Sequence, residues 1–121
     1  MESTIYLIGP RGAGKTTVGK ALSLSLDYQF IDTDNWITDK YQQTISSMVE
    51  AEGWDVFRQL ESDALIQVSQ PNQVISTGGG IVLAEKNRVY MKNSGVIVYL
   101  QASLETLVER LSQDPNEAQR P

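Results

Sequence analysis

Residues 9–16 read Gly-Pro-Arg-Gly-Ala-Gly-Lys-Thr, and this octapeptide sets the interpretation of the chain. It follows the short apolar run Ile5–Ile8, typical of a buried parallel strand, and precedes a segment with helical spacing of apolar residues. The pattern G-x-x-x-x-G-K-[ST] in this context is a P-loop, whose backbone N–H groups and helix N-terminus cradle a phosphate chain. Lys15 supplies a cation for the terminal phosphates, and Thr16 supplies a hydroxyl for Mg²⁺. The octapeptide therefore predicts a nucleotide site.

The composition limits the chemistry that the chain can perform. Its 121 residues have an ordinary globular composition and the size of one domain, and they include no cysteine and no histidine. Disulfides, thiolate nucleophiles and histidine-dependent triads are therefore excluded. A general base must be a carboxylate, a lysine or a tyrosine. A bound metal must be held by oxygen atoms, which favours Mg²⁺ over Zn²⁺.

The charge and hydropathy patterns limit the classes of partner that we expect the chain to bind. The net charge is −5, and an acidic chain without a basic stripe argues against nucleic acid as the main ligand. The first residues lack the basic start of a secretory signal, and no stretch reaches the roughly 20 apolar residues of a membrane span. We expect a cytoplasmic protein that binds neither nucleic acid nor membrane.

Strand and helix patterns alternate along the chain. Apolar runs predict strands over residues 5–8, 28–31, 74–75 and 96–100, the last of them the clearest buried strand. Periodic apolar residues predict helices from residue 15, over residues 54–68 and from Ser103, and the first should bury Val18, Ala21, Leu22 and Leu26. This alternation predicts an α/β fold with a parallel sheet, in which ligands bind beyond the carboxyl ends of the strands.

Two acids, Asp32 and Asp34, follow the second predicted strand. In an extended segment they would point to the same side. One can hold Mg²⁺, and the other can accept a proton from an attacking hydroxyl. The alternative is that Asp34 is an ordinary helix N-cap. The strand over residues 96–100 is followed by Gln-Ala-Ser, so Asp32 is the best remaining carboxylate for the metal.

A glycine run and an arginine are further candidates. Thr77 is followed by Gly78, Gly79 and Gly80, and three glycines suggest a place where a ligand meets bare backbone, although an ordinary turn would also use them. Arg58 and Glu61 lie one helical turn apart. They form either an exposed ion pair or a clamp in which Glu61 orients Arg58 toward a substrate carboxylate.

Two more arginines have ordinary alternatives. Arg110 lies at the end of the helix predicted from Ser103, where a cation is favourable in any case. Arg120 lies in the polar tail over residues 112–121 and could be a solvated loop residue. Trp36, Trp54 and Phe57 are expected in the core or a pocket wall.

In combination, these residues resemble the bacterial shikimate kinases. The resemblance rests, in chain order, on residues 9–17, 32–34, 57–61, 77–80 and 120–121, and it covers essentially the whole chain. It implies a three-layer P-loop kinase fold like that of nucleoside monophosphate kinases, with a substrate-binding segment over residues 33–60 and a lid that starts in residues 112–121. Family chains normally continue further, so we expect the family's C-terminal part to be absent from these 121 residues.

The resemblance also implies an activity and residue roles. The activity is ATP-dependent phosphorylation of the 3-hydroxyl of shikimate, on the route to chorismate and the aromatic amino acids, by a monomer that uses one Mg²⁺ ion. Asp34 would be the base, Lys15 and Arg120 would neutralise the moving phosphoryl group, and Arg110 would stack near the adenine. The remaining roles are nucleotide binding by Gly12, Ala13, Gly14, Lys15, Thr16 and Thr17, Mg²⁺ binding by Thr16 and Asp32, and shikimate binding by Asp34, Arg58, Gly79 and Gly80.

Other functions stay open from the residues alone. Another small-metabolite P-loop kinase, such as a gluconate kinase, would share the P-loop but contact its acceptor differently. A regulatory GTPase is disfavoured because the Asn-Lys-x-Asp guanine signature is missing. A fragment that binds nucleotide without catalysis is the third alternative.

Overall fold

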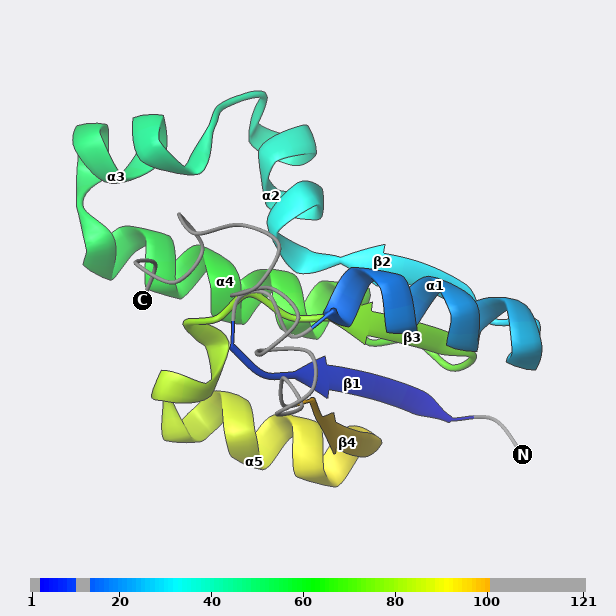
Figure 1. The fold of residues 1–121 in the computed structure, drawn as a ribbon. Coiled ribbons are helices and arrows are strands. Elements are labelled where there is room, and N and C mark those ends of the chain that lie inside the picture. The colour runs from blue at the N-terminus through cyan, green and yellow to red at the C-terminus, as the bar shows by residue number, and fades with distance from the viewer. Residues whose placement is uncertain (1–2, 11–13, 101–121) are drawn as a thin grey trace, which may run out of the picture.

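The computed structural model describes residues 3–10 and 14–100. These residues form a parallel sheet with helices on both faces (Figure 1). The strands are β1 (Thr4–Ile8), β2 (Gln29–Asp32), β3 (Gln73–Ser76) and β4 (Val96–Tyr99). The helices are α1 (Lys15–Leu26), α2 (Thr33–Tyr41), α3 (Ile45–Glu52), α4 (Trp54–Val68), the short 3₁₀ helix η1 (Ile81–Leu83) and α5 (Glu85–Ser94).

The sheet has the order β2-β3-β1-β4, and every pairing is parallel. Leu7 of β1 and Asp32 of β2 both lie opposite Ser76 of β3. The carboxyl ends of these strands therefore meet at one edge, as expected for an α/β sheet. The predicted fold class is confirmed.

Alternation along β1 divides the core into two layers. Tyr6 packs in a cluster with Leu65 of α4, Ile75 of β3 and Met91 of α5. The next residue, Leu7, points to the opposite face and contacts α1 at Gly19. Both side chains are fully buried, so the sheet is covered on both faces, and the predicted three-layer arrangement is present.

Helices α2 and α3 form an arm beside α4, at the top of Figure 1. A second cluster of buried side chains joins the three helices through Ile37, Met48, Phe57 and Ala64. Phe57 is thus a core residue, as expected, and Trp36 packs against both clusters. The other expected core aromatic, Trp54, is 55% exposed.

The predicted buried face of α1 is wrong. The helix buries Gly19 and Ser23, whereas Val18 and Leu26 are about 40% exposed, Ala21 is exposed and Leu22 is only half-buried. The reason is the close approach of the helix to the sheet. A Cβ at Gly19 would overlap the ring of Phe30 and would lie 3.0 Å from Leu7 Cδ1. Small residues allow this approach, so apolar spacing misplaced the contact face.

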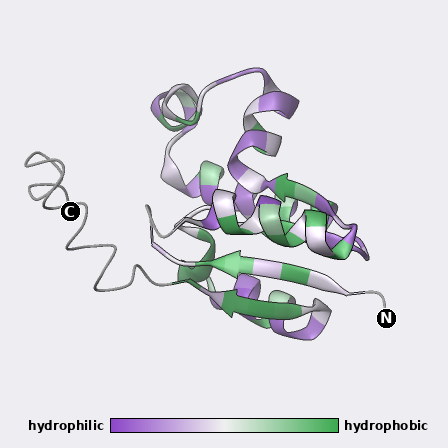
Figure 2. Ribbon diagram, turned by 45° about the vertical axis from the view of Figure 1, so that its right-hand side comes forward, coloured by the Kyte–Doolittle hydropathy of each residue, from purple (hydrophilic) through white to green (hydrophobic). Residues whose placement is uncertain are grey.

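The expectation that residues 96–100 form a buried strand also needs correction. Within the described residues β4 pairs with β1 alone, and Val96, Ile97 and Tyr99 are exposed, so it is an edge strand rather than a fully buried one. Figure 2 shows it as mostly hydrophobic at the border of the sheet.

Helices α3 and α5 were not predicted, because their segments have few buried residues. The helix predicted from Ser103 lies outside the described residues. No helix in the described part is long and apolar enough to cross a membrane.

Substitution of Gly19 tests the packing of α1. We expect Gly19→Val to lower the free energy of unfolding by about 1–3 kcal/mol, because the added side chain must displace Phe30 or the helix. Val18→Ala, one residue away on the exposed side, should change it by less than about 1 kcal/mol. Urea unfolding of both variants measures the difference. Equal changes in the free energy of unfolding for the two variants would contradict the packing of α1 against the sheet through Gly19.

Candidate active site

The described part of the P-loop has the geometry that a phosphate site requires. Gly14 is the N-cap of α1 in the left-handed conformation (φ 88°), which glycine adopts without strain. It has no side chain to cap the helix, and no acid lies in the first turn, so the first N–H groups of α1 are left for an anion. Lys15 Nζ donates a hydrogen bond of 2.5 Å to the Gly9 carbonyl oxygen, which folds the lysine back over the loop.

A cavity of about 580 Å³ lies beside this loop. Its walls come from the P-loop, from the end of β2 and from the glycine run after β3, which are the three segments expected at the carboxyl edge of the sheet. The lining residues are Pro10, Gly14, Lys15, Thr16, Thr17, Asp32, Asp34, Ser76, Thr77, Gly78 and Gly79. A second, more apolar cavity of about 400 Å³ adjoins it and shares Pro10 and residues 77–79.

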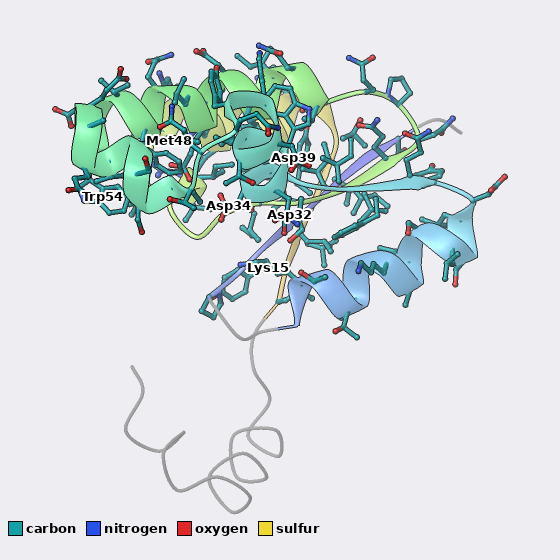
Figure 3. All side chains as sticks on the ribbon, turned by 90° about the horizontal axis from the view of Figure 1, so that it is seen from above. Lys15, Asp32, Asp34, Asp39, Met48 and Trp54 are labelled. Atoms are coloured by element: carbon teal, nitrogen blue, oxygen red, sulfur yellow. The ribbon has the colours of Figure 1, made fainter. Side chains whose placement is uncertain are left out.

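Asp32 and Asp34 both face the cavity, but not through an extended segment. Asp32 ends β2 and is itself the N-cap of α2, where its Oδ1 accepts a hydrogen bond of 3.1 Å from Asn35 N. Asp34 lies in the first turn of that helix. The expected alternation is therefore wrong, and so is the alternative that made Asp34 the cap. A helix turn, not a pleat, brings the two carboxylates to the same side, across from Lys15 (Figure 3).

The charges in this cavity influence one another. Burial raises the pKa of Asp34, and the neighbouring Asp32 carboxylate raises it further, while Lys15 and Arg58 act in the opposite direction. Burial lowers the pKa of Lys15, against the effect of the two aspartates. An aspartate with a raised pKa binds a proton more readily, which is the property of a general base.

The glycine run provides room for two functional side chains. A Cβ at Gly78 would lie 2.6 Å from Asp34 Oδ1, and a Cβ at Gly80 would overlap Arg58 Nη1. Among the described residues, no atom lies within 4 Å of such a Cβ at Gly79, which lines both cavities. The side chains of Asp34 and Arg58 thus lie against the bare backbone of this run. Contact of a ligand with the same backbone, which the sequence suggests, stays a prediction.

Arg58 and Glu61 form a half-buried ion pair. Arg58 Nη1 lies 2.6 Å from Glu61 Oε1, and the two side chains are 39% and 3% exposed. Burial raises the pKa of Glu61, and the hydrogen bond and charge of Arg58 lower it in part. The guanidinium also lies 4.8 Å from the ring centre of Trp54. These contacts hold the arginine on α4, and the burial of Glu61 shows that the pair is not a fully exposed surface pair. The clamp on a substrate carboxylate stays a prediction.

Some site residues were missed, and others lie outside the described part. The two threonines Thr33 and Thr77 are buried and bind the backbone around the cavity. Both lie in segments noted from the sequence, but neither had been assigned a role. Gly12, Ala13, Arg110 and Arg120 lie outside the described residues, as does the lid expected over residues 112–121. Arg58 and Gly80 adjoin one another beside the cavity without being part of its lining.

A P-loop with a facing pair of acids, on a parallel sheet of this order, defines a P-loop kinase. The model of the shikimate kinase family matches residues 11–121, and the chain belongs to that family. Shikimate kinase 2 of Photorhabdus laumondii is 54% identical over all 121 residues, which cover 70% of that relative. The structure of shikimate kinase from Acinetobacter baumannii in complex with shikimate is 39% identical with a TM-score of 0.81, over 94% of this chain and 64% of that one.

The chain thus spans about two thirds of the length of its relatives. A gluconokinase from Sinorhizobium meliloti has a TM-score of 0.59 at 21% identity, over 93% of this chain and 66% of that one. That likeness shows a shared fold alone, so the gluconate kinase alternative gains no support from it.

The buried carboxylate of Glu61 gives a testable pH dependence. Its folded pKa is raised above the unfolded value, so its contribution to stability is complete below the unfolded pKa and is lost as the pH rises through the folded pKa. We expect the free energy of unfolding of the wild type, minus that of Glu61→Gln, to fall as the pH rises from the ordinary pKa range of a glutamate through the raised folded pKa. Urea unfolding over this range measures it. A difference that rises with pH would mean that Arg58 outweighs the burial of Glu61.

Proposed function

We propose that the protein transfers the γ-phosphoryl group of ATP to the 3-hydroxyl of shikimate. The observation that carries this proposal is that one cavity holds both Lys15, at the P-loop, and the half-buried carboxylate of Asp34, beside the ion pair of Arg58 with Glu61. Membership of the shikimate kinase family, and a relative whose structure contains shikimate, support the choice of acceptor.

The groups that would bind the nucleotide lie on α1 and on the loop before it. The free N–H groups at the start of α1 and the ammonium of Lys15 would bind the phosphate chain. Thr16 and Asp32 line the same cavity and offer only oxygen atoms, a donor set that suits Mg²⁺ held by few protein groups together with phosphates. Bound there, Mg²⁺ would neutralise charge on the β- and γ-phosphates.

The groups that would bind shikimate, the phosphoryl acceptor, lie on α2, α4 and the glycine run. Asp34 would accept the proton of the 3-hydroxyl while that oxygen forms a bond to the γ-phosphorus and the bond to the ADP oxygen breaks. The guanidinium of Arg58 would bind the shikimate carboxylate as a planar fork, held in place by Glu61 and Trp54. Backbone groups of Gly79 and Gly80 would contact the acceptor. Positioning then accounts for most of the rate, because this transfer needs little covalent chemistry from the protein.

Three proposed roles rest on the family resemblance alone. Arg120 would close over the phosphates with the lid, and Arg110 would stack near the adenine. Gly12 and Ala13 would complete the phosphate loop. We also propose that the protein acts as a monomer in the cytoplasm, without nucleic acid or membrane partners.

A panel of acceptors tests the proposed function. The full chain is incubated with γ-labelled ATP and Mg²⁺ in the presence of shikimate, of gluconate or of neither. Label in shikimate alone supports the proposal. Label in gluconate would favour the rival kinase, and release of phosphate without any labelled acceptor would favour a nucleotide hydrolase.

Substitution of Asp34 tests the base. We expect Asp34→Asn, which keeps the shape but removes the proton acceptor, to lower kcat at least about 100-fold. The KM for ATP should change less than about threefold, because the P-loop is untouched. Steady-state kinetics measure both. Asp39→Asn, on the same helix but outside the cavity, is the matched control. A near-normal kcat for Asp34→Asn would remove Asp34 from this role.

Substitution of Arg58 tests the carboxylate clamp. We expect Arg58→Ala to raise the KM for shikimate at least about tenfold, because a charge-assisted paired hydrogen bond is lost. Arg58→Lys should recover only part of the affinity, since an ammonium cannot form the planar fork. Lys92→Ala, on α5, removes an exposed cation that lines neither cavity and is the control. An unchanged KM for shikimate in Arg58→Ala would exclude the clamp.

A further inference from the structure

We propose that Thr33 is a positioning residue, whose hydroxyl holds the glycine loop (residues 78–80) at the correct distance from the Asp34 carboxylate. This inference rests on the proposed kinase function for its kinetic consequences, but not for its structural test. Thr33 would not touch either substrate. It would act through the backbone of the loop that it anchors.

The contact that carries the proposal joins distant parts of the chain. Thr33 is the first residue of α2 and is fully buried. Its Oγ1 accepts a hydrogen bond of 3.0 Å from Gly78 N, across 45 residues of sequence. Because Asp32 and Asp34 flank Thr33, the turn that carries both carboxylates is tied directly to the start of the glycine loop.

The loop has a second anchor that Thr33 does not influence. Thr77 N and Thr77 Oγ1 both donate to the Leu7 carbonyl oxygen of β1, at 3.1 and 2.9 Å. Thr77 therefore attaches the loop to the sheet, and Thr33 attaches the next residue to α2. The Thr33 hydroxyl thus fixes the direction in which the chain leaves the sheet toward the cavity.

The space between the loop and the carboxylate leaves little tolerance. A Cβ at Gly78 would already lie 2.6 Å from Asp34 Oδ1, and the Arg58 guanidinium rests against Gly80. A shift of the loop by a fraction of an ångström would therefore move the backbone under both side chains. Loss of the Thr33 acceptor also leaves a part-buried N–H without its partner, and burial of an unsatisfied donor is unfavourable.

Two substitutions separate a hydrogen-bonding role from a packing role. Thr33→Val keeps the shape and removes the acceptor, whereas Thr33→Ser keeps the acceptor and removes a methyl group. If Thr33 only fills space, Val should be the better replacement. If the hydroxyl positions the loop, Ser should be the better one. Thr38→Val, on the same helix, removes a partly exposed hydroxyl that donates to the Asn35 carbonyl oxygen of α2 and is the control.

Amide hydrogen exchange tests the anchor without any assay of activity. We expect Thr33→Val to speed exchange at Gly78 about tenfold or more, and Thr33→Ser and Thr38→Val to stay within about threefold of the wild type. Thr77 N, whose acceptor is Leu7, is the internal reference and should stay unchanged. Unchanged exchange at Gly78 in Thr33→Val, or an equal rise at Gly78 and Thr77, would overturn the proposal. If Thr33→Val does not fold, Thr33→Ala replaces it in the same comparison with Thr33→Ser.

Kinetics of the full chain test the consequence. We expect Thr33→Val to lower kcat/KM for shikimate about tenfold or more, with the KM for ATP within about threefold and with Thr33→Ser near the wild type. A wild type that does not phosphorylate shikimate would contradict the proposed function but leave the exchange result standing. An active wild type with an equally active Thr33→Val would overturn the role of Thr33 alone.

Discussion

The parallel register of β1, β2 and β3 is the constraint on which the site depends. Because Leu7 and Asp32 both lie opposite Ser76, three chain segments leave the sheet at one edge. These segments are the P-loop, the turn over residues 32–34 that carries both aspartates, and the glycine loop. A shift of one strand by a single residue would turn its side chains to the other face and would separate the ammonium of Lys15 from the carboxylate of Asp34. The chemistry of the cavity is therefore a consequence of sheet pairing.

Sequence reasoning succeeded where the deciding geometry is local. Three features depend on neighbours within a few residues: the P-loop residues that the structure describes, the position of Asp32 and Asp34 at the end of β2, and the pair of Arg58 with Glu61. The helix N-cap at Thr44, whose Oγ1 accepts from Ser47 N, was also a local signal and could have revealed α3. Local rules suffice for such features because the chain itself supplies both partners.

The features that sequence reasoning missed depend on contacts between distant segments. The burial of Gly19 follows from the ring of Phe30, and the burial of Thr33 follows from its bond to Gly78. No periodic pattern encodes either contact. The error at Asp32 has a different cause, because its bond to Asn35 N is local: spacing assumed an extended segment, whereas helix α2 starts between the two acids.

The three glycines after β3 are equivalent in sequence but not in structure. Side chains at the outer two would collide with the aspartate and the arginine that lie against them. A Cβ at the middle one would meet no atom of the described part of the chain within 4 Å and would lie where the two cavities adjoin. The outer glycines therefore make room for the protein's own side chains, and the central glycine borders the space where a ligand could bind. Replacement of an outer glycine should disturb the enzyme before any ligand arrives, and replacement of the central one should matter only by taking up room that a ligand needs.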